Sequence, residues 1–305
     1  MNELVKNLKS LEIETLKNLK NSKSPNTLRA YESDFKDFSR FCSINNFSSL
    51  PADPKILSLY LTQLSKTSKF STLKRRIASI SVIHKIKGYY IDTKHPLVME
   101  NLLGIKRLMG SNQKSKKPIL INDLKQIIDL INKLEIKPKR KLRDKALILI
   151  GFAGGFRRSE LVALEYEDIE FVREGVKIFV RRTKTDQSGE GMTKAIPSFD
   201  KAMYCPVAHL QDWLFEKENK KGKIFSISDK SVALIIKKYA NLIGLNGEKY
   251  AGHSLRSGFA TSTAESGAEE RNIMAMTGHK TSQMVRRYIQ EANLFKNNAL
   301  NKIKI

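Results

Sequence analysis

The chain has 305 residues and a mass of 34.7 kDa, which predicts about two domains, each able to bury a core. A hydrophobic content of 41% and an aromatic content of 8% exclude a disordered or fibrous protein, and no apolar run approaches the roughly 20 residues of a membrane helix. The 55 basic and 31 acidic residues give a net charge of +24. This charge favours a polyanionic partner, most often nucleic acid, although some lysine-rich chains are basic without binding one.

The start of the chain and its cysteines indicate a cytoplasmic protein. The N-terminus mixes charged residues with spaced leucines and lacks the apolar region of a signal peptide. Cys42 and Cys205 are far apart in the sequence, so neither a disulfide framework nor a zinc cluster is predicted. We therefore expect a reducing, cytoplasmic compartment, no membrane contact, no metal and no cofactor.

Residues 1–110 predict a helical domain. Its first main helix begins at Ser24 and Pro25, a favourable N-cap and first-turn pair. Further helices are expected after Asp53, over about 71–87 and over about 96–109, and an amphipathic segment near 2–20 is left open. The apolar face of the first main helix follows the helical spacing and comprises Leu28, Tyr31, Phe35, Phe38, Phe41 and Cys42.

The helix predicted at 71–87 is strongly basic. Between Lys66 and Ile91 there are seven lysines or arginines and no acidic residue. Such a run is often only a solvated helix face, but in a protein of this charge it favours contact with a DNA backbone. The residues predicted to bind DNA are Lys74, Arg75, Arg76, Lys85 and Lys87.

Residues 111–118 are polar and basic and predict a linker to a second domain at 119–305. Most of this domain has helical periodicity, but its middle contains three short strand-like runs separated by turn signals. The predicted fold is therefore mainly α, with a helical N-terminal domain and a mostly α second domain that contains a small antiparallel sheet. Helices are expected near 121–134, 140–153, 206–218, 229–243, 253–265, 268–276, 282–290 and 293–303, and strands within 166–172, 176–183 and 193–198.

Two pairs of polar residues in the second domain stand at i, i+3 near helix starts. Arg157 and Glu160 have the spacing of an ordinary surface salt bridge. His253 and Arg256 lie where the positive end of a helix disfavours imidazolium, so His253 could accept a proton near neutral pH. By itself each pair is explained as well by a structural role.

A histidine, a tyrosine and a lysine complete the set of candidate residues. His279 lies nine residues before Tyr288. Tyr288 also falls on an apolar helical stripe, so by itself it is best explained as a core tyrosine. Lys184 lies between two predicted strands, where a lysine at a hairpin turn is usually solvated. The other members of the stripe are Met284, Val285 and Ile289.

Taken in order, these motifs resemble those of the tyrosine recombinases, the phage integrase family. The pattern is R-x-x-E, a lysine at a hairpin turn, H-x-x-R, G-H, and a tyrosine nine residues later. The resemblance extends from about residue 24 to about residue 295. It implies a core-binding (SAM-like) N-terminal domain that clamps DNA, followed by a catalytic domain.

The resemblance implies a role for each reacting residue. Tyr288 attacks the scissile phosphate and stays attached as a 3′-phosphotyrosine. Arg157 and Arg256 hold the non-bridging oxygens. Lys184 protonates the departing 5′ oxygen. Because the phosphotyrosine conserves the energy of the phosphodiester, neither ATP nor a metal is implied.

The remaining residues assist these by the same resemblance. His253 acts as a base toward the tyrosine, His279 donates a hydrogen bond to the phosphate, and Glu160 orients without reacting. Arg158 departs from the family pattern, because an apolar residue is common at this position, and it is expected either to contact phosphate or to face water.

The resemblance further implies site-specific recombination of double-stranded DNA, for integration, excision or resolution. Four protomers would act on two DNA sites, with monomers or dimers off DNA. About 23 residues precede the clamp domain. In this arrangement the chain is similar to the two-domain recombinases, which include the Cre- or Xer-like enzymes and those of mobile elements. Two other classes stay open: a type IB topoisomerase that relaxes DNA, and a DNA-binding protein with a silent active site. A basic chromatin-like protein does not explain the ordered motifs.

The last residues, 292–305, carry a short apolar stripe at helical spacing. A helix this short must bury its stripe to be stable. It either caps its own domain or, as is the habit of the family, docks in a neighbouring protomer and links the active sites of the assembly. The stripe consists of Leu294, Phe295, Ala299, Leu300 and Ile303.

Overall fold

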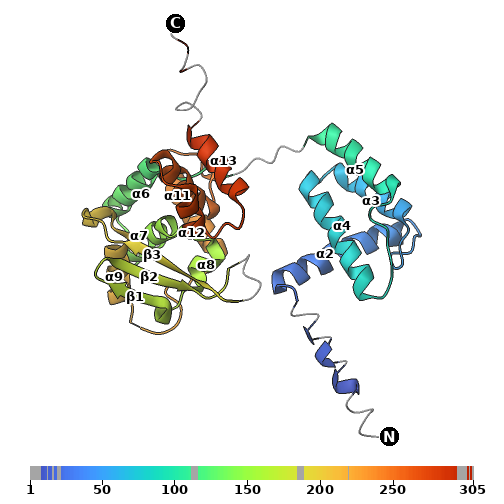
Figure 1. The fold of residues 1–305 in the computed structure, drawn as a ribbon, viewed down its shortest axis with the longest axis horizontal. Helices are drawn as coiled ribbons and strands as arrows, with labels where there is room; N and C mark the ends of the chain where they lie inside the picture. The colour runs from blue at the N-terminus through green and yellow to red at the C-terminus, as the bar shows by residue number, and fades with distance from the viewer. Residues whose placement is uncertain are drawn as a thin grey trace. The chain divides into compact units, whose positions relative to one another are not determined.

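The computed structural model describes residues 8–11, 13–15, 17–18, 22–110, 116–183, 189–218, 220–293, 301 and 303. The chain falls into two compact units, Met1–Lys114 and Ser115–Ile305, each with its own hydrophobic core. Helices dominate both units, and a three-stranded antiparallel sheet lies in the second (Figure 1). The predicted fold class, mainly α with a small antiparallel sheet, is confirmed. No helix in the described ranges has the length and apolar character needed to cross a membrane.

The first unit is built from helices whose starts follow the sequence signals. The Ser24 side chain accepts a hydrogen bond from the amide of Thr27, and Asp53 accepts one from the amide of Lys55. Proline occupies the first turn of three of these helices, where its missing N–H costs nothing. Residues 8–11, 13–15 and 17–18 are also helical. The main helices are α2 (Pro25–Ile44), α3 (Pro54–Ser65), α4 (Phe70–Ile86) and α5 (Pro96–Met109).

The core of the first unit lies between α2, α3, α4 and α5. Phe38 of α2 is fully buried, and Phe35 and Phe41 pack beside it. The ring of Phe38 meets that of Tyr60 edge-on at 5.1 Å. The apolar face predicted for residues 24–44 therefore points into the core. Fully buried side chains from the other helices are Leu57, Leu61, Leu73, Ile80 and Val98.

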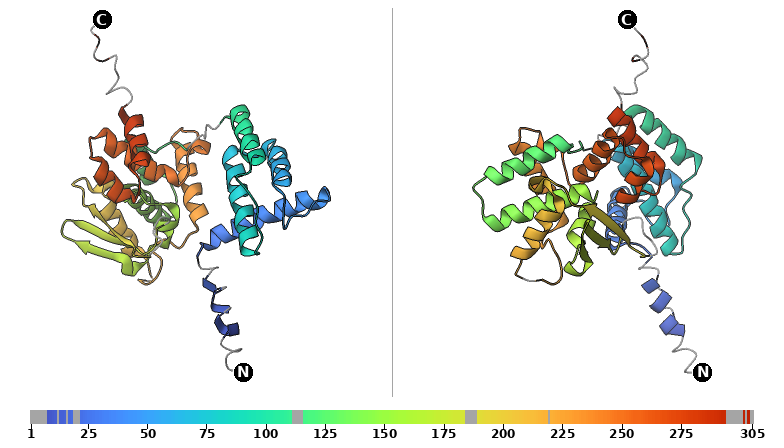
Figure 2. Two further views of the ribbon diagram at one scale, coloured as in Figure 1. Left: turned by 45° about the vertical axis from the view of Figure 1, so that its right-hand side comes forward. Right: turned by 60° about the vertical axis from the view of Figure 1, so that its left-hand side comes forward.

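The second unit is arranged around α7, whose residues 146–150 are all buried. Its sheet lies at the edge of the unit, which Figure 2 shows from two further sides. The helices of this unit are α6 (Ile121–Lys133), α7 (Pro138–Ala153), α8 (Arg158–Ala163), α9 (Pro206–Glu216), α10 (Asp229–Leu242), α11 (His253–Glu265), α12 (Glu270–Thr277) and α13 (Ser282–Asn293). Single 3-10 turns are η1 (Tyr166–Asp168), η2 (Ala202–Tyr204) and η3 (Gly247–Lys249). The strands are β1 (Ile169–Val172), β2 (Gly175–Val180) and β3 (Met192–Pro197).

The sheet has the order β1-β2-β3, with both pairs antiparallel. Alternate residues of β3 face the core, and these are Lys194 and Ile196. The first predicted strand is shorter than expected, because residues 166–168 form η1. The Asp168 carboxylate accepts a hydrogen bond from the amide of Glu165 at 2.9 Å and closes a turn there. The helix predicted near 293–303 lies largely outside the described residues.

The segment before α6 crosses α11 at a glycine. The amide of Ile119 donates to the carbonyl of Ser254 at 3.0 Å. A Cβ on Gly258 would stand 1.9 Å from the carbonyl oxygen of Ile119. Only glycine permits this approach, because the group that a side chain would meet is backbone.

We predict that Gly258→Ala destabilises the second unit. The added methyl group must push apart two backbone segments, which costs about 1–3 kcal/mol or more. The matched control is Gly104→Ala in α5, where nothing lies within 4 Å of the new Cβ; there alanine should stabilise by up to about 1 kcal/mol. Urea unfolding measures the free energy of unfolding of both variants. A Gly258→Ala protein as stable as the wild type would contradict the close contact between Gly258 and the carbonyl of Ile119.

Candidate active site

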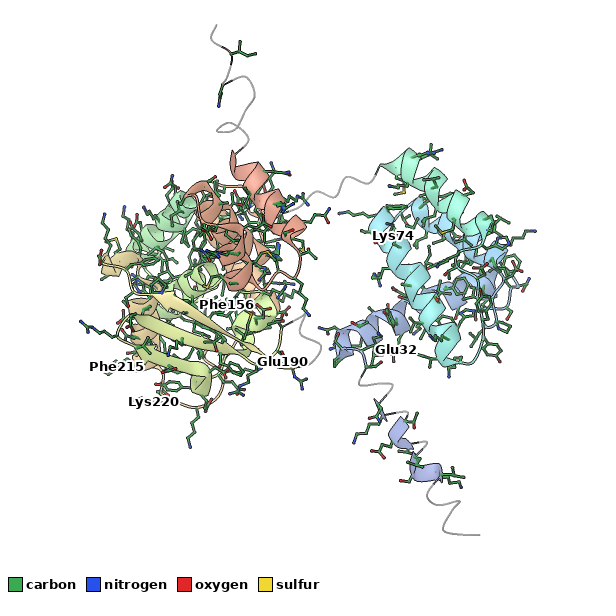
Figure 3. The ribbon with its side chains drawn as sticks, in the orientation of Figure 1. Glu32, Lys74, Phe156, Glu190, Phe215 and Lys220 are labelled. Carbon is green, nitrogen blue, oxygen red and sulfur yellow. The ribbon has the colours of Figure 1, made fainter. Side chains whose placement is uncertain are left out.

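The turn between α7 and α8 brings the first candidate arginine to the site. Gly155 has φ +53°, in the left-handed region that favours glycine. A Cβ on Gly154 would stand 2.1 Å from the ring of Phe156, so the ring can fold back over the turn only because residue 154 is glycine. Phe156 is buried in the second unit (Figure 3). The turn delivers Arg157 to the N-cap of α8.

Glu160 holds Arg157 at two points. Its carboxylate accepts the backbone amide of Arg157 at 2.9 Å and the Nη1 atom of the guanidinium at 2.6 Å. Glu160 is buried, whereas the Arg157 side chain is 18% exposed. Glu160 thus reaches back to the N-cap amide of α8, as the acidic residue of a capping box does, and at the same time fixes the direction of the arginine. The predicted orienting contact of Glu160 is present in this geometry.

Arg256 is the least expected feature of the site, since this arginine side chain of α11 is fully buried. Its Nη1 atom donates to the carbonyl of Gly155 at 2.8 Å. Its Nε and Nη2 atoms are buried and have no hydrogen-bond partner among the described residues. Burial and the nearby charge of Arg157 lower the pKa of Arg256 to about 10. Unpaired buried donors are costly, and an anion with oxygen atoms would satisfy them.

Tyr288 and His253 meet at the same site. The Tyr288 hydroxyl lies 3.4 Å from Nε2 of His253, a long contact of the kind that tightens when a substrate binds. His253 is the first residue of α11. Its pKa is lowered by desolvation and by the charges of Arg256, Arg157 and Arg158, although part of the residue reaches solvent. At neutral pH the imidazole is neutral and can accept a proton.

The hydrogen bonds of Thr277 fix the tautomer of His279. The Thr277 hydroxyl donates to the carbonyl of Ile273 at 2.6 Å, so it can only accept from Nδ1 of His279, at 2.8 Å. The neutral imidazole then carries its proton on Nδ1 and leaves Nε2 as an acceptor. His279 can donate through Nε2 only after it is protonated. Gly278, with φ +62°, ends α12 and turns the histidine to this position.

Lys184 lies outside the described residues, but a second lysine occupies the site. Lys194 of β3 is buried, and its ammonium donates to the carbonyls of Gly154 at 2.6 Å and Met276 at 2.7 Å. Lys194 is not among the site residues predicted from the sequence. The signal was present in the alternation of β3, which places Lys194 on the same face as buried Ile196.

The Arg158 side chain is 41% exposed and faces water in part. Its Nη2 atom lies 3.7 Å from the Asp229 carboxylate. Its aliphatic stem passes over Gly252, where a Cβ would stand 2.1 Å from the Cγ atom of Arg158. Gly252 directly precedes His253, so this contact packs α8 against the start of α11.

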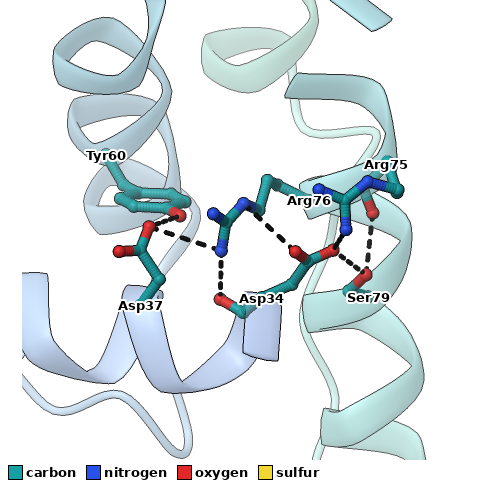
Figure 4. A network of polar contacts seen from close by, with 6 residues as sticks. All are labelled: Asp34, Asp37, Tyr60, Arg75, Arg76 and Ser79. Atoms are coloured by element: carbon teal, nitrogen blue, oxygen red, sulfur yellow. Dashed lines mark hydrogen bonds and ion pairs between the residues drawn. The ribbon is translucent and has the colours of Figure 1, made fainter. Parts of the chain in front are cut away.

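The basic helix of the first unit divides into exposed and internally paired residues. Asp34 of α2 is buried, accepts a hydrogen bond from Ser79 at 2.7 Å, and forms ion pairs with Arg75 and Arg76 (Figure 4). Arg76 also lies 3.3 Å from the Asp37 carboxylate, and its side chain is only 15% exposed. Arg76 thus joins α2 to α4. Arg75 is both paired with Asp34 and exposed. The other residues predicted to bind DNA, Lys74, Lys85 and Lys87, are exposed.

We predict that His279 makes the free protein less stable toward acid. Burial and nearby positive charges, Arg256 first among them, lower the pKa of His279 to about 4, whereas an unfolded histidine takes up its proton near pH 6.5. The unfolded state therefore binds more protons between these values, and stability is lost as the pH falls through that window. In His279→Gln the loss should be smaller by on the order of 1–3 kcal/mol.

Urea unfolding of both proteins at intervals between pH 7.5 and 4 measures this difference. The two stability curves should converge or cross as the pH falls. Parallel curves would show that His279 titrates alike in the folded and unfolded chain.

Two family models match the chain, and together they cover both units. The model described as "Phage integrase family" matches residues 117–294. The model described as "Phage integrase, N-terminal SAM-like domain" matches residues 13–87.

Individual relatives agree with these matches. The chain is 41% identical to the integrase/recombinase xerD homolog of Selenomonas ruminantium, over 99% of this chain and 92% of that protein. It is 25% identical to tyrosine recombinase XerA of Pyrococcus horikoshii, over 82% of this chain and 87% of that protein.

Solved structures share the fold at lower identity. The Tn1549 transposon integrase in complex with transposon right end DNA is similar with a TM-score of 0.62 at 15% identity, covering 92% of this chain and 94% of that one. A lambda integrase dimer bound to a COC′ core site is similar with a TM-score of 0.61 at 19% identity, covering 93% of each chain. With its order of motifs, its two matching family models and a relative of 41% identity, the chain belongs to the phage integrase family of tyrosine recombinases.

Proposed function

We propose that this protein is a site-specific DNA recombinase that breaks and rejoins strands through a 3′-phosphotyrosine at Tyr288. The observation that carries the proposal is the pair of buried Arg256 donors that have no partner in the described part of the chain and lie next to Arg157. Guanidinium donors in this arrangement suit the non-bridging oxygens of a phosphate. The neighbouring Tyr288 and His253 supply a nucleophile with a base in reach.

The cleavage step follows from these contacts. The Tyr288 oxygen attacks phosphorus while its proton passes to Nε2 of His253. The bond from phosphorus to the 5′ oxygen breaks, and that oxygen leaves with a proton from Lys184, by the resemblance to the family. Arg157 and Arg256 neutralise the charge that grows on the non-bridging oxygens. Religation is the reverse, with a 5′-hydroxyl of another strand as the nucleophile.

His279 contributes to phosphate binding only as a cation. In the free protein its Nε2 is an acceptor, because Thr277 takes up the proton on Nδ1. A phosphate beside it would raise its pKa, since an opposite charge favours the protonated form. A hydrogen bond from His279 to the phosphate is thus coupled to uptake of one proton.

Double-stranded DNA is the proposed partner. The net charge of +24 and the exposed Lys74, Lys85 and Lys87 support contact with phosphates. The Tn1549 and lambda integrases that share the fold are described as DNA complexes, and the same partner is proposed for this chain. We place the protein among two-domain recombinases of mobile elements or of the Xer type, acting in the cytoplasm without metal or ATP.

The assembly proposed on DNA is a tetramer linked by C-terminal tails. An apolar cavity of about 830 Å³ in the second unit includes none of the candidate catalytic side chains in its lining. The apolar stripe at 292–305 matches this cavity in chemistry, and we assign the tail of a neighbouring protomer as its occupant. The aromatic and sulfur-containing side chains in the lining are Phe152, Phe199, Tyr204, Phe259 and Met276.

We predict that Tyr288→Phe abolishes the covalent adduct and leaves binding to a single site nearly unchanged. The variant lacks only one hydroxyl, which lies 3.4 Å from Nε2 of His253. The assay is adduct formation on a nicked suicide substrate, resolved by denaturing electrophoresis, with binding measured by gel shift. An adduct in the variant would assign the nucleophile elsewhere. In the wild type, relaxed circles without site-dependent exchange would favour a topoisomerase.

A second prediction separates the two kinds of basic residue in α4. Lys74→Ala should weaken DNA binding, make the dependence of affinity on salt shallower by about one ion, and leave stability unchanged. Arg76→Ala should instead destabilise the first unit by roughly 1–3 kcal/mol, because buried Asp34 loses one of its cations. Salt titrations of binding and urea unfolding measure both effects. Identical behaviour of the two variants would contradict this division.

A further inference from the structure

Lys194 is a lysine on the core-facing side of the sheet. It is 1% exposed, and across the sheet it stands opposite fully buried Ile178. Lysine is almost never buried to this degree unless its ammonium is paired. Replacing its hydration shell therefore requires partners inside the protein.

The partners of Lys194 are the ends of two helices. Its Nζ atom donates to the carbonyl of Gly154 at 2.6 Å and to that of Met276 at 2.7 Å, and it lies 4.4 Å from the centroid of the Phe156 ring. Gly154 is the C-cap of α7, and Met276 lies in the last turn of α12. Carbonyls at these positions lack a partner within the helix and carry the negative end of its dipole.

These two helix ends lead directly into the active site. Gly154 opens the turn to Arg157, and Met276 is followed by Thr277, which fixes the tautomer of His279. Lys194 thus links the segment that carries Arg157 to the segment that carries His279. These two segments are far apart in the sequence.

The link persists whether or not Lys194 is charged. Burial, together with Arg256 and Arg157, lowers its pKa to about 7, and Glu160 opposes this shift. A neutral amine still has two N–H donors, which is enough for both carbonyls. The contact geometry therefore suits a positioning function over the whole neutral range.

We propose that Lys194 is a positioning residue of the active site. It fixes the end of α7 against the end of α12 and thereby sets the positions of Arg157 and His279 relative to the scissile phosphate. It acts through these two side chains, while Lys184 keeps the predicted role of proton donor. The proposal rests on the proposed recombinase function.

The test is Lys194→Met in the full chain, which removes both donors and keeps an unbranched side chain. The matched control is Lys177→Met on β2 of the same sheet, where the side chain is 48% exposed. Lys194→Met should bind a single site with unchanged affinity but form the adduct roughly 100-fold more slowly at saturating protein, the cost of a misplacement of about 1 Å. Lys194→Arg, which keeps N–H donors, should be faster than Lys194→Met.

Two modified substrates separate positioning from other roles. A methylphosphonate at the scissile position carries no charge and needs the cationic clamp less, so the defect of Lys194→Met should shrink on it by about tenfold or more. A 5′-bridging sulfur makes a leaving group that needs no acid. It should restore Lys184→Ala but leave Lys194→Met slow.

Each contrary result has a defined meaning. An adduct rate within about threefold of the wild type overturns the proposal. If Lys194→Met forms the adduct equally slowly on the charged and the neutral phosphate, Lys194 is a stabilising residue only. The same conclusion follows if the Lys194→Met chain does not fold. Recovery with the bridging sulfur makes it the proton donor. If the wild type itself forms no adduct on any DNA, the proposed function fails, and not the role of Lys194 within it.

Discussion

The burial of the Arg256 guanidinium is the interaction on which the rest of the active site depends. Removing a cation from water costs several kcal/mol unless it is paired and hydrogen-bonded. Here the protein supplies one carbonyl, that of Gly155, and leaves Nε and Nη2 without a partner among the described residues. Glu160 is the nearby carboxylate, and it is already held by Arg157. The stabilisation that is missing in the free protein is what a phosphate would provide.

Three helix ends lie near this guanidinium, and their partial charges act on the neighbouring side chains. The C-terminal carbonyls of α7 and α12 face the ammonium of Lys194, where the negative end of a helix stabilises a cation. The N-terminus of α11 lies at His253, and its positive end acts in the same direction as desolvation and the nearby arginines, which lower the pKa of this histidine. Helix ends thus bind the amine of Lys194 and lie beside the neutral imidazole of His253.

The sequence predicted those parts of the fold and site that depend on local spacing. Ser24 with Pro25 and Asp53 with Pro54 mark helix starts because capping involves neighbouring residues. Arg157 and Glu160 pair because i, i+3 residues share a helix face. Lys194 was missed because its partners, Gly154 and Met276, are 40 and 82 positions away. Asp34 was missed likewise, since it interrupts an apolar face and is paired by arginines of another helix.

The helix that carries Tyr288 is attached by a small apolar contact. The buried cluster beneath α13 consists of Ala260, Ala264, Ile273 and Val285, and Val285 is the member from α13 itself. Two alanines and two β-branched residues bury little area compared with the core around α7, and hydrophobic stabilisation scales with that area. Segments with few buried apolar contacts open at low free-energy cost. The helix that carries Tyr288 thus rests on a smaller buried apolar cluster than α7 does, whereas the Arg256 and Lys194 side chains are fully enclosed.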